Sequence, residues 1–313
     1  MFERIVVPLD GSRFAESALI PARELARTFG SKILLVRAES PGGLPVVSVP
    51  GERQSDLEKL NLADEYMHDV LASLKSAGFD ADMVISISEA GAGIAQAAEL
   101  SHADVIIMAT HLRWKVSPKT GPSTTLNVLA RSHVPILAWR ASPEEEQIRS
   151  RAPRSPVLNA SAESPIIVPL DGSRFGESAL PYAEALSRAF GSYIVLVQAV
   201  EVNHGDLGAA ASSKEALDYL EQVRKEILLR KGHAITVVRA GTPLSVIERA
   251  WREFNGSLVV MASHGHTGIL RTFLGSVAAR IIEEVEAPIL VVRPAGNQNE
   301  YQPAHAVRTE QNV

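Results

Sequence analysis

The sequence predicts two α/β domains in tandem, each a doubly wound parallel sheet of five strands covered by helices. Two observations support this prediction. A segment close to the N-terminus returns almost unchanged in the middle of the chain. In each copy, short runs rich in Val, Ile and Leu alternate with helical patterns. Strands without polar alternation are buried on both faces, as in a parallel sheet between helices, and right-handed crossovers complete the fold.

The internal repeat is the clearest feature of the chain. Residues 7–19 and residues 168–180 differ only at Ala15 and Gly176. Later matches are 153 residues apart instead of 161, so the first copy holds eight extra residues. We place them in the Pro- and Gly-rich stretch 41–51. A repeat of this length indicates duplicated domains and not a solenoid.

The composition between and after the two copies predicts the domain boundaries. Residues 142–163 are rich in Pro, Ser and charge and lack apolar periodicity, which is typical of a linker. We expect domain 1 over residues 1–141, domain 2 over residues 164–295 and a disordered polar tail over residues 296–313.

The second copy shows the order of elements most clearly. Apolar spacing predicts a helix that begins at Ser173 and ends at Gly191, and another that ends at Gly232, since glycine often follows the last helical residue. In chain order we expect strands over residues 165–170, 193–200, 235–240, 257–262 and 289–292, with helices over residues 173–190, 213–231, 243–254 and 277–284.

Composition and charge exclude several classes of protein. The 313 residues are 46% hydrophobic and 21% charged, which is ordinary for a globular protein. A net charge of −5 argues against a nucleic-acid binder. The chain has no cysteine, so disulfides, thiolate metal sites and thiol catalysis are excluded. We find neither a signal peptide nor an apolar run of about 18 residues, and we expect a cytoplasmic protein without a membrane span.

Two loops are expected at the carboxyl edge of the second sheet, where such folds bind ligands. The first loop holds Asp171, with Asp10 at the same place in the first copy. The Asp can accept hydrogen bonds from a sugar or a base edge, or it can belong to a helix cap, and the two interpretations stay open.

The second loop follows the fourth strand and runs from Ala262 to Ser276. Gly265 and Gly268 permit tight turns, and Gly275 and Ser276 open the last helix. A helix N-terminus presents N–H groups and a positive dipole end, so this loop predicts a phosphate site. A glycine-rich loop that only has to turn is the alternative.

With these residues in place, the chain resembles a tandem universal stress protein, a resemblance that covers nearly the whole sequence. The ATP-binding members of that family carry glycine, two residues, glycine, nine residues, and glycine followed by Ser or Thr. Ala262, Gly265, Gly275 and Ser276 stand at these positions, with Ala262 departing from the first glycine. The resemblance implies a Rossmann-like fold of the adenine-nucleotide alpha-hydrolase-like type. It also implies an intramolecular pseudo-dimer in which the last strands of the two domains lie side by side.

The resemblance further implies ATP, with or without Mg²⁺, in domain 2. The family's strand-one Asp corresponds to Asp171, its neighbouring Pro to Pro169, and the residue that flanks the adenine to Ala199. The whole candidate site comprises Pro169, Asp171, Ala199, Met261, Ala262, His264, Gly265, His266, Gly268, Gly275, Ser276 and Val277.

The first copy departs further from the family pattern. Leu112 stands at the position of Gly265, and Pro122 at the position of Gly275. Proline removes a backbone N–H that would face a phosphate, so we expect domain 1 not to bind ATP in the family's manner. Lys115 and Lys119 could still attract an anion, although a solvated loop is the simpler interpretation.

Other polar residues give weaker evidence of a function. His264 and His266 have no third ligand nearby in the sequence, so we expect no metal site. Neither Ser12 nor Ser173 has a positioned base or an oxyanion motif, so we expect no catalysis beyond slow ATP hydrolysis.

Three functions remain open from the sequence. The first is a nucleotide-binding stress-response protein with regulatory or protective action, whose partners are an adenine nucleotide and unidentified proteins. The second is a nucleotide-independent interaction module, in which the glycines are structural relics. The third, an enzyme on a related nucleotide-binding fold, has least support, because the His-x-x-His and PP-loop signatures are absent. Association into a further homodimer stays open.

Overall fold

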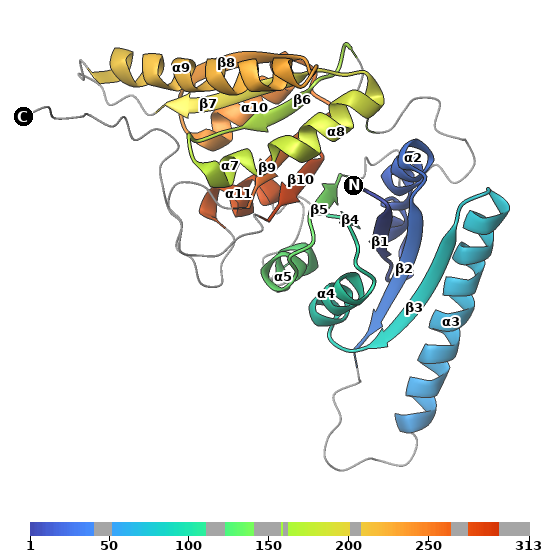
Figure 1. The fold of residues 1–313 in the computed structure, drawn as a ribbon. Helices are drawn as coiled ribbons and strands as arrows, with labels where there is room; N and C mark the ends of the chain where they lie inside the picture. The colour runs from blue at the N-terminus through green and yellow to red at the C-terminus, as the bar shows by residue number, and fades with distance from the viewer. Residues whose placement is uncertain are drawn as a thin grey trace, which may run out of the picture. The chain divides into compact units, whose positions relative to one another are not determined.

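A computed structural model describes residues 1–40, 52–110, 123–140, 158, 162–200, 208–263 and 275–293. The chain forms two compact units, and each is described by itself (Figure 1). Unit 1 comprises Met1–Asn159 with Ile282–Leu290, and unit 2 comprises Ala160–Ile281 with Val291–Val313.

The first repeat alternates strands and helices from its first residues. Its elements are β1 (Arg4–Pro8), α1 (Arg13–Glu16), α2 (Leu19–Phe29), β2 (Lys32–Glu39), α3 (Glu52–Ser76), β3 (Ala81–Ile87), α4 (Ala90–Leu100), β4 (Val105–Ala109), α5 (Thr124–Arg131) and β5 (Ile136–Trp139). The strand order is β3-β2-β1-β4-β5. In Figure 1, α2 and α3 cover one face of this sheet and α4 and α5 the other.

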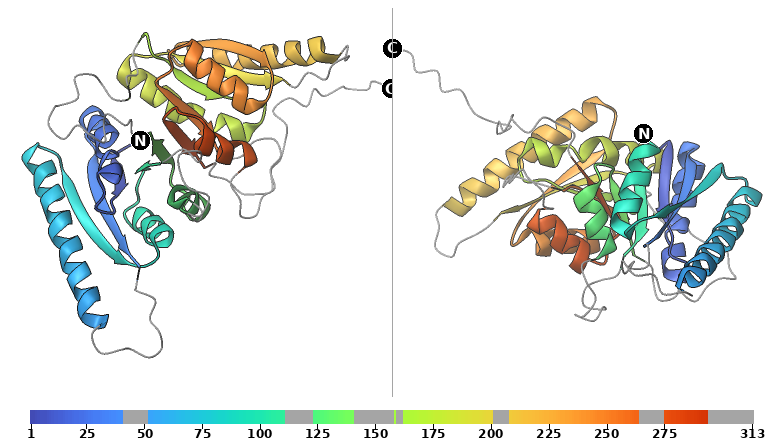
Figure 2. Two further views of the ribbon diagram at one scale, coloured as in Figure 1. Left: turned by 180° about the vertical axis from the view of Figure 1, so that it is seen from behind. Right: turned by 90° about the horizontal axis from the view of Figure 1, so that it is seen from below.

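The second repeat has the same succession. Its elements are β6 (Ile166–Pro169), α7 (Arg174–Glu177), α8 (Leu180–Phe190), β7 (Ile194–Val200), α9 (Gly208–Leu229), β8 (Ala234–Ala240), α10 (Pro243–Glu253), β9 (Leu258–Ala262), α11 (Ser276–Glu284) and β10 (Ile289–Val292). The strand order is β8-β7-β6-β9-β10. Figure 2 shows from behind the helix α10 on the face of this sheet opposite to α9.

The pairing of the strands confirms the predicted fold class. In unit 2, β6 pairs in parallel with β7 and β9, and β7 pairs in parallel with β8. In unit 1, the pairs of β1 with β2 and β4 are likewise parallel. Residues such as Ile167, Val195 and Val259 are fully buried, as expected for strands covered on both faces. Within each unit, the parallel direction brings the carboxyl ends of the strands to one edge of that unit's sheet.

The predicted helix over residues 173–190 is wrong in one respect, because the structure breaks it into α7 and α8. Pro181 lies in the first turn of α8. A proline there has no N–H to donate to the carbonyl four residues earlier, and its ring clashes with that carbonyl, so one helix cannot run through this point. In unit 1, α1 and α2 are separated likewise, and Pro21 lies one residue later in α2, where α8 has Tyr182.

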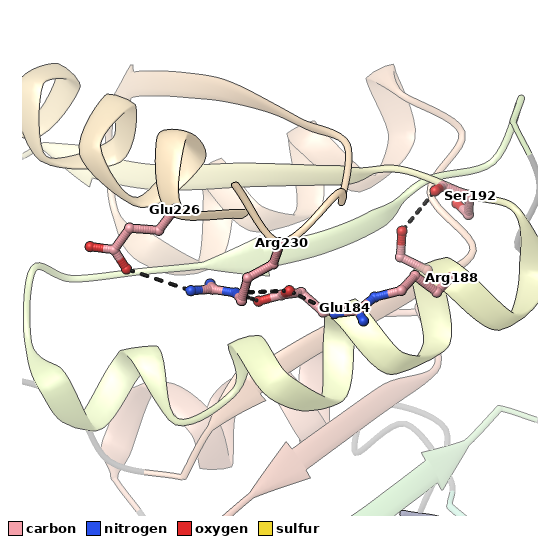
Figure 3. Close-up of polar contacts among 6 residues, drawn as sticks. Glu184, Arg188, Ser192, Glu226 and Arg230 are labelled. Atoms are coloured by element: carbon pink, nitrogen blue, oxygen red, sulfur yellow. Dashed lines mark hydrogen bonds and ion pairs between the residues drawn. The ribbon is translucent and has the colours of Figure 1, made fainter. Parts of the chain in front are cut away.

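A buried ion pair supports the α8 side of unit 2. The side chain of Glu184 is 5% exposed and accepts hydrogen bonds from Arg230 through Nε and Nη2, the latter at 2.9 Å. Arg188 donates to the other oxygen of Glu184 at 3.0 Å. Figure 3 shows both guanidinium groups turned toward Glu184, with Glu226 on the far side of Arg230. The pairing supplies the partners that a buried carboxylate needs.

The eight extra residues of the first repeat fall between the second and the third strand. Ile33 of β2 pairs with Ala81 of β3, and Ile194 of β7 pairs with Ala234 of β8 in the same register. The offset between repeats is therefore 161 at the second strand and 153 at the third. The stretch 41–51 itself lies outside the described residues.

The predicted linker and tail lie largely outside the described residues. Within the linker, Leu158 is buried, and its N–H donates to Oε2 of Glu24 at 2.7 Å in unit 1. Among the helices that the structure describes, none is long and apolar enough to span a membrane.

Candidate functional site

The candidate site of unit 2 begins where β6 ends. Leu170 continues the ladder by donating its N–H to the carbonyl of Val197 at 2.8 Å. Gly172 then adopts φ +82°, a left-handed conformation that favours glycine, and the chain turns into α7. We call residues 170–173 the strand-one loop; residues 9–12 form its counterpart in unit 1.

The carboxylate of Asp171 is fixed by this turn. Its Oδ1 accepts hydrogen bonds from the backbone N–H of Ser173 at 3.1 Å and from the Ser173 hydroxyl at 2.6 Å. Ser173 is the cap of α7 and accepts from the N–H of Gly176 at 3.1 Å. Asp171 is therefore bonded to the residue that caps α7, which agrees in part with the capping interpretation. These bonds also hold its carboxylate at the carboxyl edge of the sheet.

Residues 7–19 and 168–180 differ at one position, and in unit 2 the residue at that position, Gly176, lies against this carboxylate. A Cβ on Gly176 would lie 2.8 Å from Oδ1 of Asp171, closer than normal packing allows. Unit 1 has Ala15 at this place, and Asp10 there is exposed, whereas Asp171 is half-buried. The hydrogen bonds from Ser12 to Asp10 are nevertheless the same as in unit 2.

The end of β7 supplies the neighbouring part of the edge. Ala199 is half-buried and pairs with Arg239 of β8. Gly241 closes this corner by donating its N–H to the carbonyl of Val200 at 3.1 Å. Pro169, the last residue of β6, is half-buried and pairs with Val197. The structure thus brings Pro169, Asp171 and Ala199 to one edge of the sheet.

The segment that joins β9 to α11, which we call the phosphate loop after its predicted role, begins at the same edge of the sheet. Met261 and Ala262 end β9 and are buried. Ser263 donates its N–H to the carbonyl of Val292 at 2.8 Å and accepts from the N–H of Gly275 at 3.0 Å. The two ends of the phosphate loop are therefore tied together, and the N–H of Gly275 is engaged inside the protein.

The start of α11 has backbone donors that lie outside the helix's own hydrogen-bond pattern. Ala279 donates its N–H to the carbonyl of Gly275, so Gly275 is the cap residue and Ser276 the first helical residue. The first N–H groups of a helix have no partner within the helix, which here concerns Ser276 and Val277. Both residues are exposed, and α11 has 9 residues, enough for a dipole at this end.

Several predicted site residues lie outside the described residues. These are His264, Gly265, His266 and Gly268 in unit 2, and Leu112, Lys115, Lys119 and Pro122 in unit 1.

A tyrosine–glutamate contact beside the strand-one loop was not predicted from the sequence. The hydroxyl of Tyr219 on α9 donates to Oε1 of Glu177 at 3.0 Å. Burial raises the pKa of the Tyr219 phenol, and the nearby Glu177 carboxylate raises it further. Unit 1 has the same contact between Tyr66 and Glu16. Both residues recur in the two copies, so comparing the repeats with each other could have found the pair.

The corresponding edge of unit 1 differs in its polar side chains. Arg37 stands where unit 2 has Gln198, and its Nε donates to Oε1 of Glu39 at 2.6 Å. The hydroxyls of Ser86 and Ser88 lie 2.8 Å apart at the end of β3. Across the described part of the chain, no cluster of three or more His, Asp or Glu side chains could hold a metal ion.

Comparison with known families gives a match over both repeats. The model of the universal stress protein family matches residues 1–140 and 164–293. Universal stress protein MJ0531 of Methanocaldococcus jannaschii is 27% identical over 137 residues, which cover 41% of this chain and 81% of the relative.

A solved structure of the same family shares the fold along nearly the whole chain. A universal stress protein from Archaeoglobus fulgidus superposes with a TM-score of 0.68 at 19% identity, covering 93% of this chain and 96% of that one. A universal stress protein solved in complex with cAMP covers 42% of this chain and 97% of its own, at 19% identity and a TM-score of 0.36. The first of these likenesses shows a common architecture along nearly the whole chain.

Proposed function

The chain belongs to the universal stress protein family, with two such domains in tandem, and from this premise we propose that its second domain binds ATP or a related adenine nucleotide. The chain then acts as a stress-response protein in which the nucleotide is a switch that orders the phosphate loop and alters contacts with protein partners. Domains over residues 1–141 and 164–295, joined by the linker 142–163, are part of this proposal.

One observation carries the proposal. The carboxylate of Asp171, the strand end at Ala199 and the N-terminal end of α11 all lie at the carboxyl edge of the same parallel sheet. Folds of this kind bind ligands at that edge. The carboxylate suits ribose hydroxyls, and the helix end suits a phosphate group.

The residues divide by role. Pro169, Asp171 and Ala199 hold the nucleoside, while Met261 and Ala262 form the buried wall below the phosphates. Backbone N–H groups of Ser276 and Val277 bind phosphate oxygens, and the Ser276 hydroxyl adds a donor. The N–H of Gly275 stays with Ser263, so it serves the shape of the loop and not the ligand. His264, Gly265, His266 and Gly268 complete the phosphate side of the proposed site.

The proposed site is a binding site and not a catalytic one. Phosphoryl transfer needs a residue that orients the attacking group and a cation that neutralises developing charge. The described residues at this edge supply the carboxylate of Asp171 and the N-terminal end of α11. In this proposal, these groups bind a nucleotide but do not activate a water molecule. We propose at most slow hydrolysis, with or without Mg²⁺.

Calorimetric titration of the full chain, freed of co-purified nucleotide, tests the proposal. We expect Mg-ATP to bind with a stoichiometry of one per chain, because the first domain lacks the glycine pattern. Parallel titrations with ADP and cAMP rank the adenine ligands. A folded sample that gives no heat with any of the three would sink the proposal and leave a nucleotide-independent interaction module.

A further inference from the structure

A buried amide oxygen in the candidate site of unit 2 has no hydrogen-bond partner among the described residues. It is Oε1 of Gln198, which lies on β7 immediately before Ala199. The other end of the amide, Nε2, lies 4.0 Å from where a Cβ of Gly172 would be. The amide therefore lies against the strand-one loop, next to the residue that follows Asp171.

Such an oxygen is costly to leave unpaired. A buried acceptor without a donor bears the full penalty of its lost hydration, and native proteins contain few of them. At a surface loop far from any site it would signal only local strain. Here it belongs to the residue that precedes Ala199, and the same amide lies against Gly172, the neighbour of Asp171, so a ligand donor is the natural partner.

The first repeat has a different residue with different contacts at this position. Arg37 replaces Gln198, and its Nε is already bonded to Glu39, where unit 2 has Val200. The guanidinium lies over the ring of Tyr66 at 5.9 Å and within 2.8 Å of a Cβ position on Gly11. An arginine has no acceptor. Unit 1 therefore fills this place with its own ion pair, whereas unit 2 leaves an acceptor open.

We infer that Gln198 is a specificity-determining residue of unit 2, whose Oε1 accepts a hydrogen bond from the nucleoside part of the ligand. The inference rests on the proposed function and deepens it. An adenine nucleotide offers two kinds of donor to this oxygen, the 6-amino group of the base and the ribose hydroxyls. Arg37 excludes the same recognition from unit 1.

The variant Gln198→Met in the full chain tests the inference, since methionine keeps the length of the side chain and removes the acceptor. We expect the affinity for ATP to fall roughly tenfold. We also expect the Tm of the ligand-free protein to rise, because the unpaired buried oxygen is gone. A residue that only supports the fold would lower the Tm when replaced.

Three analogues identify the donor. Inosine triphosphate lacks the 6-amino group, and 2′-deoxy-ATP and 3′-deoxy-ATP each lack one ribose hydroxyl. One of these analogues lacks the donor that bonds to Gln198. The wild type should bind that analogue less tightly than it binds ATP, whereas Gln198→Met should bind the analogue and ATP equally tightly. Arg37→Met, the matched change in unit 1, should leave ATP affinity unchanged.

The outcomes separate this inference from the proposed function. If the wild type binds ATP and Gln198→Met binds it within about twofold, the inference is overturned and the nucleotide site stands. A Tm that falls together with the affinity also overturns it, because Gln198 would then be structural. A wild type that binds no adenine nucleotide overturns both.

Discussion

Tyr219 donates its hydroxyl to Oε1 of Glu177 over 3.0 Å, which joins the long helix α9 to the turn that follows the strand-one loop. Tyr66 and Glu16 make the same bond in unit 1, at 3.2 Å. Because α7 is a single turn of four residues, it has little stability of its own. The bond to α9 therefore helps to hold in place the turn whose cap binds Asp171.

The stability of the protein should depend on this phenol at high pH. The folded pKa of Tyr219 lies above its unfolded value of 10.0, so the stabilisation is complete below pH 10 and is lost as the pH rises through the folded value. Tyr219→Phe should cost about 1 kcal/mol at neutral pH and lose less stability than the wild type above pH 10. Urea unfolding from pH 8 upward, with Tyr193→Phe as control, measures this. If the free energy of unfolding fell equally with rising pH in the wild type and in Tyr219→Phe, the contact would be unimportant.

Gly275 allows the phosphate loop to be tested without changing a side-chain contact. Proline there removes the N–H that donates to Ser263, so we expect Gly275→Pro to lose about 1 kcal/mol of stability and most ATP affinity. Gly275→Ala retains the N–H and should bind ATP within about threefold of wild type. Calorimetry on both variants, with folding checked by circular dichroism, gives the comparison. Tight ATP binding by Gly275→Pro would mean that the hydrogen bond from Gly275 to Ser263 is not needed to shape the phosphate site.

The buried carboxylate of Glu184 should dominate the ion pair shown in Figure 3. Glu184→Ala removes the acceptor of two guanidinium groups and should cost about 1–3 kcal/mol. Arg188→Ala should cost less than about 1 kcal/mol, since Arg188 is 56% exposed and Arg230 remains bonded to both carboxylate oxygens. Arg230→Ala should fall between the two in urea unfolding. An order in which Arg188→Ala is the most damaging would contradict the geometry.

A glycine in α4 makes room for the two serines at the edge of unit 1. A Cβ on Gly93 would clash with Oγ of Ser88 and lie 2.9 Å from Oγ of Ser86, so Gly93→Ala should cost about 1–3 kcal/mol in urea unfolding. Unit 2 has the opposite arrangement, with Gly241 against Val246. Ser88→Gly added to Gly93→Ala should therefore recover part of the loss, because it removes the clashing hydroxyl. A double variant as unstable as the sum of its parts would show that the crowding lies elsewhere.

The sequence predicts the scaffold well because its signals are local. The uninterrupted apolar runs around Ile167 and Val259 mark buried parallel strands, and Gly191 ends its helix in a left-handed conformation, as predicted. The break between α7 and α8 was missed although Pro181 signals it. The apolar spacing on either side of the break fits one continuous helix, and the prediction followed that spacing.

The site was predicted less completely, because its contacts join residues that are far apart in the sequence. The partner of Tyr219 lies 42 residues away, and no local pattern pairs them. The unpaired oxygen of Gln198 follows from the packing of β7 against the strand-one loop, which no spacing reveals. The engagement of Gly275 by Ser263 likewise became visible only once the two ends of the phosphate loop were placed together.

In each repeat, the parallel direction of the strands separates the residues that keep the fold from the residues whose chemistry differs between the two copies. Residues that hold each sheet together lie in its middle, whereas residues that could contact a ligand lie at the carboxyl ends of the strands and in the turns that follow. Replacement of Gln198 by Arg37, or of Val200 by Glu39, changes the chemistry of that rim while the neighbouring ladder keeps its register. One copy of a duplicated domain can therefore carry different polar side chains at this edge while it keeps the same fold.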